Sequence, residues 1–132
     1  MLTLDTSALY ALLNRRDPDH AAVREALLAD GGPWLVPAAI LGEVAYLVEA
    51  RLGSRVLDLL LKDLEEGVFA LDCGRERIGR ARALAARHAD LPLGFVDAAV
   101  AACAAENGGR VLTLDRRDFE VLAEELPLAL LP

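Results

Sequence analysis

The chain has 132 residues, of which 55% are apolar, and its 21 acidic residues outnumber 14 basic ones to give a net charge of −7. The length fits one domain, and the apolar share excludes an intrinsically disordered chain. An aromatic content of 5% and the acidic balance argue against a stacking platform for single-stranded nucleic acid and against a simple basic patch that grips phosphates.

The first half of the chain alternates short apolar runs, which predict strands, with apolar residues at helical spacing. Pro37 occupies the favoured first position of a helix, and Gly53 and Gly67 follow the predicted ends of two helices. In this half the expected strands are residues 2–5 and 34–36, and the expected helices are residues 6–13, 19–30, 37–52 and 54–66.

The second half continues the same alternation, and the Asn107-Gly108-Gly109 run is a strong stop between a helix and a strand. Strands are expected at residues 68–71, 110–115 and 128–131, helices at 75–88, 95–106 and 116–122, and a connection at 91–94. The strands lack polar alternation, which is typical of parallel strands covered on both faces. The sequence therefore predicts a single α/β domain over residues 1–132, with a small parallel central sheet flanked by helices on both faces.

Compartment and cysteine chemistry can also be predicted from the sequence. No apolar run reaches the roughly 18 residues that span a membrane, and the start of the chain lacks the basic segment of a secretory signal. We therefore expect a cytoplasmic protein without membrane association. In that reducing compartment Cys73 and Cys103 are expected to be core thiols rather than a disulfide. His20 and His88 have no ligand spacing with the cysteines and are expected on the surface.

Four acidic residues occupy unusual positions. The tetrapeptide Leu-Thr-Leu-Asp occurs twice, so that Asp5 and Asp115 each end a predicted strand. Ligands of open α/β sheets bind beyond the carboxyl ends of the strands, although an Asp there can also cap the next helix. Glu43 and Asp97 are the only charges in two apolar helical stretches, where a buried carboxylate requires a partner. A salt bridge or a more exposed face is the alternative explanation for each of them.

A shared site for these four acids requires a cation, because converging carboxylates repel one another. Ligation by oxygen alone suits Mg²⁺ or Mn²⁺, and the absence of a His–Cys ligand pattern disfavours zinc. A carboxylate-held Mg²⁺ typically acts on phosphates by activating water and neutralising charge on a phosphoryl oxygen. The sequence therefore favours chemistry at a phosphate group.

The sequence resembles the PIN-domain ribonucleases, close to the VapC-type toxins of bacterial toxin–antitoxin pairs. The resemblance covers nearly the whole chain and rests on the order and spacing of residues 4–9, 37–44, 91–98 and 112–119. It implies a Mg²⁺- or Mn²⁺-dependent endoribonuclease that cuts single-stranded or loop RNA. It also implies a homodimer and a cognate antitoxin protein as partner.

The resemblance also implies which residues form the site. The family's acidic quartet corresponds to Asp5, Glu43, Asp97 and Asp115, with Asp5, Asp97 and Asp115 as direct metal ligands and Glu43 completing the shell or orienting water. The hydroxyl beside the first Asp is expected from Thr6 in preference to Ser7. Asp118, one helical turn after Asp115, is either a further ligand or a first-turn acid favoured by the helix dipole.

Arginine pairs provide candidate contacts to the RNA backbone. Arg15 and Arg16 follow the first predicted helix, and Arg116 and Arg117 follow a strand end. The four side chains are therefore candidates for phosphate binding at the rim of the site. Solvated surface charge is the alternative explanation.

Other classes of protein also place acids at strand ends. A phospho-signalling receiver domain needs an acid pair after its first strand and a late lysine, whereas Asp5 stands alone and the only lysine is Lys62. A haloacid-dehalogenase-type phosphatase needs an Asp two residues after the first, where this chain has Ser7. Two alternatives remain: a non-catalytic PIN-like module that binds RNA or protein, and a housekeeping PIN nuclease without an antitoxin.

Overall fold

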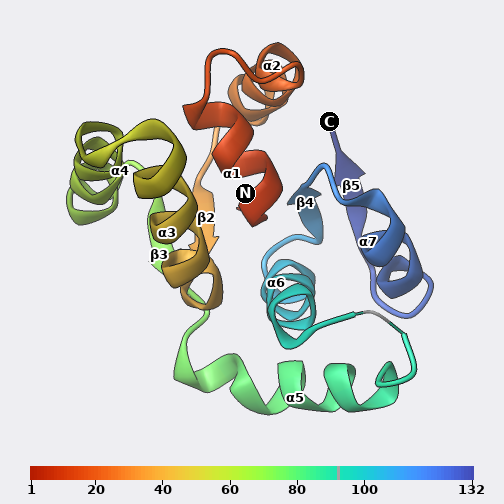
Figure 1. The fold of residues 1–132 in the computed structure, drawn as a ribbon. Coiled ribbons are helices and arrows are strands. Elements are labelled where there is room, and N and C mark those ends of the chain that lie inside the picture. The colour runs from red at the N-terminus through yellow and green to blue at the C-terminus, as the bar shows by residue number, and fades with distance from the viewer. Residues whose placement is uncertain (92) are drawn as a thin grey trace.

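The computed structural model, which describes residues 1–91 and 93–132, contains one five-stranded sheet with the strand order β3-β2-β1-β4-β5 (Figure 1). The strands are β1 (Leu2–Leu4), β2 (Trp34–Pro37), β3 (Ala70–Asp72), β4 (Arg110–Leu112) and β5 (Ala129–Leu131), and neighbouring strands are parallel. All three β1 side chains are fully buried although successive side chains point to opposite faces, so both faces of the sheet are covered. The predicted α/β class with a small parallel sheet is confirmed.

The helices connect the strands and cover the sheet (Figure 1). In the described ranges they are α1 (Thr6–Leu13), α2 (His20–Asp30), α3 (Leu41–Leu52), α4 (Ser54–Glu66), α5 (Ile78–Arg87), α6 (Phe95–Glu106) and α7 (Arg116–Ala123). Short 3₁₀ turns, η1 (Ala38–Ile40) and η2 (Arg75–Arg77), precede α3 and α5. None of these helices is long and apolar enough to cross a membrane.

Helix α6 is the most deeply buried helix and positions one of the candidate acids. Every residue from Ala98 to Ala104 is buried, and the helix packs against β1, β2 and β4 as well as against α5. The many alanines let the neighbouring backbones approach closely, because little side-chain volume separates them. Asp97 lies in the first turn of this helix, so the packing of α6 fixes where its carboxylate is held.

Strand β1 lies at the centre of the sheet, between β2 and β4. The backbone N–H of Asp5 donates a hydrogen bond of 3.0 Å to the carbonyl oxygen of Leu112, which aligns the ends of β1 and β4. Residues that follow these two strands therefore meet at one edge of the sheet, as expected for parallel neighbours. This edge brings together segments more than 100 positions apart in the chain.

Several predicted boundaries differ from the observed ones. Pro37 ends β2 and pairs with Asp72 rather than starting a helix, because its backbone is extended (ψ 136°) and proline's fixed φ suits both conformations. Strand β3 starts two residues later than predicted, because the N–H of Val68 closes α4 by bonding to the carbonyl of Asp63. The helix predicted over 75–88 divides into η2 and α5. The predicted connection at 91–94 includes Pro92, which lies outside the described residues.

The expectation of free cysteine thiols is wrong. Cys73 follows β3 and Cys103 lies in α6, and the two sulfurs form a disulfide with the Cα atoms 5.6 Å apart. The fold brings the residue after β3 next to α6, a proximity that the 30-residue separation in the sequence does not reveal. Reasoning from the compartment alone therefore missed a covalent link between the edge strand and the helix that carries Asp97.

The two histidines are partly buried and bonded rather than free on the surface. His20 Nδ1 lies 2.9 Å from the carbonyl oxygen of Ala11, which joins the start of α2 to α1. His88 Nε2 lies 2.9 Å from a carboxylate oxygen of Glu125. Both contacts tie together helix ends and loops, and neither histidine lines the cavity described below.

Candidate active site

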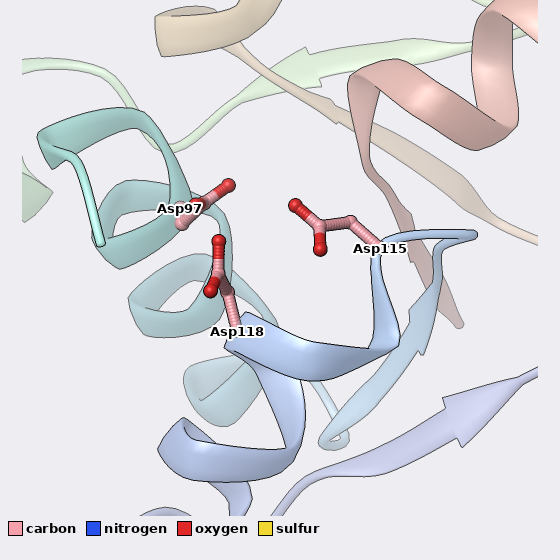
Figure 2. Close-up of side chains that lie close together, drawn as sticks. All are labelled: Asp97, Asp115 and Asp118. Atoms are coloured by element: carbon pink, nitrogen blue, oxygen red, sulfur yellow. The ribbon is translucent and has the colours of Figure 1, made fainter. Parts of the chain in front are cut away.

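Three aspartates converge beyond the carboxyl end of β4. Asp97 comes from the first turn of α6, Asp115 precedes α7 at its N-cap, and Asp118 lies in the first turn of α7. One carboxylate oxygen from each lies within 4.8 Å of the other two, and Figure 2 shows the three side chains pointing toward one another. The two helices therefore present three negative charges to one small volume.

The close approach of these carboxylates changes their acidity. Burial, followed by the nearby charges of Asp5 and Asp115, raises the pKa of Asp97 from 3.8 to about 7. Burial and the charge of Asp118 also raise the pKa of Asp115. Each shift reflects the cost of holding several negative charges together with limited access to water. A cation bound between them would remove that cost.

Asp5 lies beside this trio but has protein partners of its own. Its side chain is 4% exposed, and its Oδ2 accepts hydrogen bonds from Thr113 Oγ1 at 2.8 Å and from Ser7 Oγ at 3.0 Å. Burial raises the pKa of Asp5, while these hydrogen bonds oppose the increase. One oxygen is thus held by hydroxyls, and the carboxylate as a whole lines the same cavity as Asp97 and Asp115.

Thr113 joins the two halves of the site and was not singled out from the sequence. Besides donating to Asp5, its hydroxyl accepts the backbone N–H of Asp115 at 3.0 Å. Ser7 forms a parallel link, because its hydroxyl accepts the N–H of Leu114 at 3.0 Å. The repeated Leu-Thr-Leu-Asp motif was the available signal, but the corresponding Thr3 hydroxyl is buried without a partner among the described residues. The two threonines therefore differ in role although their sequence contexts match.

The structure reverses the expected preference between the two hydroxyls beside Asp5. Ser7, the less favoured candidate, makes the hydrogen bond to Asp5. Thr6 Oγ1 is buried, has no hydrogen-bond partner in the described parts of the chain, and belongs to a residue that lines the cavity. An unsatisfied buried hydroxyl at this place is available to a ligand.

Glu43 lines a cavity of about 560 Å³ that it shares with Asp5, Asp97 and Asp115. The structure thus brings the four acids of the predicted quartet to one cavity. Glu43 is exposed, however, so the inference that it is a buried charge in an apolar helix is wrong. The wide apolar face of α3 serves the core at Val44 and Val48, and Glu43 points away from it.

The arginines near the site are arranged differently from the sequence-based expectation. Arg51, which was not predicted, lines the acidic cavity from the last turn of α3 and lies 5.6 Å from the ring centre of Tyr10. Arg116 and Arg117 are exposed and pair with Glu120 and Asp118 at 3.4 and 3.6 Å. The predicted Arg15 and Arg16 are also exposed but do not line the cavity. Helical spacing from Glu43 was the signal for Arg51, since position 51 lies on the same face of α3.

The donor set of the site fits a hard divalent cation. The clustered ligands are carboxylate oxygens, with neither sulfur nor imidazole among them, which is the ligand chemistry of Mg²⁺ and Mn²⁺ rather than of zinc. The raised pKa values show that the uncompensated charge is unfavourable. Asp97, Asp115 and Asp118 are the residues that could hold such an ion, and Asp5 and Glu43 line the same cavity as Asp97 and Asp115.

Comparison with known proteins agrees with this geometry. The family model described as PIN domain matches residues 2–125. Ribonuclease VapC26 of Mycobacterium tuberculosis is 35% identical over 123 residues, which are 92% of this chain and 91% of that protein. PIN nucleases use divalent metal, in agreement with the acidic cluster.

Solved structures show the same fold. The sarcin–ricin loop cleaving toxin VapC20 of Mycobacterium tuberculosis has a TM-score of 0.79 and 25% identity, with 96% of each chain covered. DNA-bound VapBC from Salmonella typhimurium has a TM-score of 0.66 and 23% identity, over 98% of this chain and 95% of that one. From the family model and these relatives we conclude that the chain belongs to the PIN-domain family and, within it, to the VapC-type ribonucleases.

Proposed function

We propose that the protein is a Mg²⁺- or Mn²⁺-dependent endoribonuclease whose reaction takes place between Asp5, Asp97 and Asp115. The observation that carries this proposal is the cluster of carboxylates at the edge of the sheet, where the pKa of Asp97 is raised to about 7. A cluster that is unfavourable without a cation and composed only of oxygen ligands supports metal-dependent phosphate chemistry. Kinship with a ribonuclease supports RNA as the substrate.

The residues of the cavity have separate roles in this proposal. Asp97, Asp115 and Asp118 would hold the ion, and a bound ion would supply activation of a water and neutralisation of charge on the phosphoryl oxygen. Asp5 adds a fixed negative charge, because Thr113 and Ser7 hold its carboxylate in one orientation. Glu43 lines the same cavity as Asp5, Asp97 and Asp115 and orients water at the reacting phosphate.

The rim of the cavity supplies contacts to the RNA strand. Arg51 is the guanidinium that lines the cavity itself, and its position against Tyr10 fits a contact to a backbone phosphate. The buried Thr6 hydroxyl, which has no partner in the described residues, donates to a substrate oxygen. Arg15, Arg16, Arg116 and Arg117 are exposed and provide weaker, longer-range attraction.

The first test of this proposal is cleavage of a fluorescein-labelled, quenched RNA by the purified protein. Cleavage is expected with Mg²⁺ or Mn²⁺ and is expected to stop when EDTA is added, because the carboxylates alone repel a phosphate. The same RNA with deoxyribose throughout serves as a control for sugar specificity. Absence of RNA cleavage with either ion would favour the non-catalytic binding module.

Thr113→Val is expected to reduce kcat/KM about 10- to 100-fold, because residues that orient metal-binding groups typically have effects of this size. The variant removes the donor to Asp5 and the acceptor for Asp115 with little change in volume. Thr3→Val is the matched control, since its hydroxyl is equally buried but unpaired among the described residues. Equal activity of the two variants would show that the Thr113 hydroxyl does not organise the site.

We also propose that the protein is the toxin of a toxin–antitoxin pair, with a cognate antitoxin as partner, and that it is a homodimer. Structures of VapBC and FitAB complexes with the same fold support the antitoxin proposal. Co-purification with the product of an adjacent small reading frame, together with loss of nuclease activity in that complex, is the expected result. Light scattering of the isolated protein tests the dimer. If none of the products of the adjacent genes lowers the nuclease activity of the protein, the protein is instead a housekeeping enzyme.

A further inference from the structure

A second cavity, of about 280 Å³, opens beside the catalytic cavity. Its walls come from η1, η2 and the first turns of α5 and α6, and α5 crosses below α6 in Figure 1. Small side chains form much of the wall, namely Ala38, Ala39, Ala81 and Ala99. Phe95 lines this cavity and also the catalytic cavity, so the two cavities are neighbours that share this residue.

Phe95 is exposed in a position where packing does not require an aromatic ring. Its exposed fraction is 46%, and Ile78 on the other side of the cavity is 50% exposed. Phe95 is the first residue of α6, two positions before Asp97, so the same helix turn carries both the ring and one of the clustered carboxylates. A large exposed apolar surface next to a catalytic site is informative because buried positions normally hold such side chains.

Two arginines also line this cavity. Arg75 is exposed, and Arg77 is held in place because its terminal nitrogen pairs with Glu106. The cavity therefore offers an apolar ring face beside a positive rim. A flat group attached to a phosphate matches both features.

We infer that this cavity, the base pocket, binds a nucleobase of the RNA adjacent to the phosphate that is cut. The inference rests on the proposed function, because it assigns the RNA strand to the neighbouring catalytic cavity. The base stacks on Phe95, and a flanking phosphate lies near Arg75. Stacking on aromatic side chains is the usual way in which proteins bind unpaired RNA bases. The pocket thereby fixes which phosphate of the strand enters the carboxylate cluster.

The test separates base contacts from backbone contacts in a protein that does not need to cleave. The Asp97→Asn protein is titrated with a fluorescein-labelled RNA decamer in which every position is abasic, and with the same decamer carrying a single adenine, guanine, cytosine or uracil. The strand can shift its register so that the lone base reaches the pocket. At least one base is expected to tighten binding about 5- to 100-fold relative to the abasic strand, as a stacked base does.

Variants of the base pocket then show which residues cause the tighter binding of the strand that carries a base. Phe95→Ala in the Asp97→Asn background is expected to abolish the gain from the base and leave binding of the abasic strand unchanged. Phe95→Trp is expected to keep it, and Ala38→Leu, which fills the pocket, is expected to reduce it. Leu28→Ala removes an equally exposed side chain (53%) on α2 and serves as the matched control.

An undiminished gain from the base in Phe95→Ala would overturn the base pocket. If that variant also changes from dimer to monomer, the surface is assigned to a second copy of the chain. Cleavage by the unmodified protein with Mn²⁺ is measured separately. A loss of the base gain in Phe95→Ala without any cleavage by the unmodified protein would contradict the proposed function and leave the pocket supported.

Discussion

Asp97→Asn is expected to reduce metal-dependent RNA cleavage about 1,000-fold or more without unfolding the protein. The substitution keeps the shape of the side chain but removes one of three clustered negative charges. A ligated ion typically contributes several kcal/mol of transition-state stabilisation, and a loss of about 4 kcal/mol corresponds to this factor. Initial rates on the quenched RNA substrate measure the loss, and far-UV circular dichroism reports the fold.

Asp58→Asn on α4 provides the control for a simple change in net charge, because this acid is exposed and does not line the catalytic cavity. Its cleavage rate is expected to remain within twofold of the unmodified protein. Cleavage by Asp97→Asn at the same rate as by Asp58→Asn would contradict the assigned site. Unfolding of Asp97→Asn would instead indicate a structural role for this carboxylate.

The affinity of the site for Mn²⁺ is expected to fall as the pH drops below 7, with a slope that approaches tenfold for each pH unit. The pKa of Asp97 is raised to about 7, so below that pH the ion must displace one proton from this carboxyl group. Because half of this group is already protonated at pH 7, the expected loss from Asp97 alone between pH 7 and pH 5 is about 50-fold. Calorimetric titration at several pH values, in buffers of different ionisation enthalpy, measures both the affinity and the proton released.

The metal-free protein is expected to show the opposite dependence on pH. Since the pKa of Asp97 in the folded protein lies above its ordinary value of 3.8, protonation stabilises the folded state. This contribution is complete below about pH 4 and is lost as the pH rises through 7. Thermal unfolding in EDTA should therefore show decreasing stability from pH 5 to pH 8, and Asp97→Asn should flatten this dependence. A flat profile for the unmodified protein would contradict the raised pKa.

The elements of the fold could be predicted because each carries a local signal. The apolar run at Leu2–Leu4 and the Ala-rich stretch of α6 have the period and length of their structures. The errors occurred where competing signals are equal or where the deciding contact is not local. Pro37 suits a strand end as well as a helix start, and the pairing of Cys73 with Cys103 depends on two elements that meet only in the folded chain.

The residues of the candidate site also fall into those that a local sequence signal predicts and those that depend on contacts between distant segments. Asp5 and Asp115 could be predicted because strand ends and repeated motifs can be recognised in the amino-acid sequence. The network through Thr113 could not be found, since its partner in the opposite half of the chain lies 108 positions away. Glu43 shows a further limit: the absence of neighbouring charges suggested burial, but the orientation of α3 on the core leaves this side chain exposed. Helical spacing alone does not fix that orientation.

The central position of β1 beside β4 has a consequence for protein synthesis. Strand β1 is synthesised more than 100 residues before its neighbour β4 and before two of the three clustered carboxylates, Asp115 and Asp118. A nascent or prematurely terminated chain that stops before Arg110 thus carries Asp5, Glu43 and Asp97 without the strand that aligns them. A nuclease with this order of elements cannot act on RNA near the ribosome until its chain has been made through Asp118.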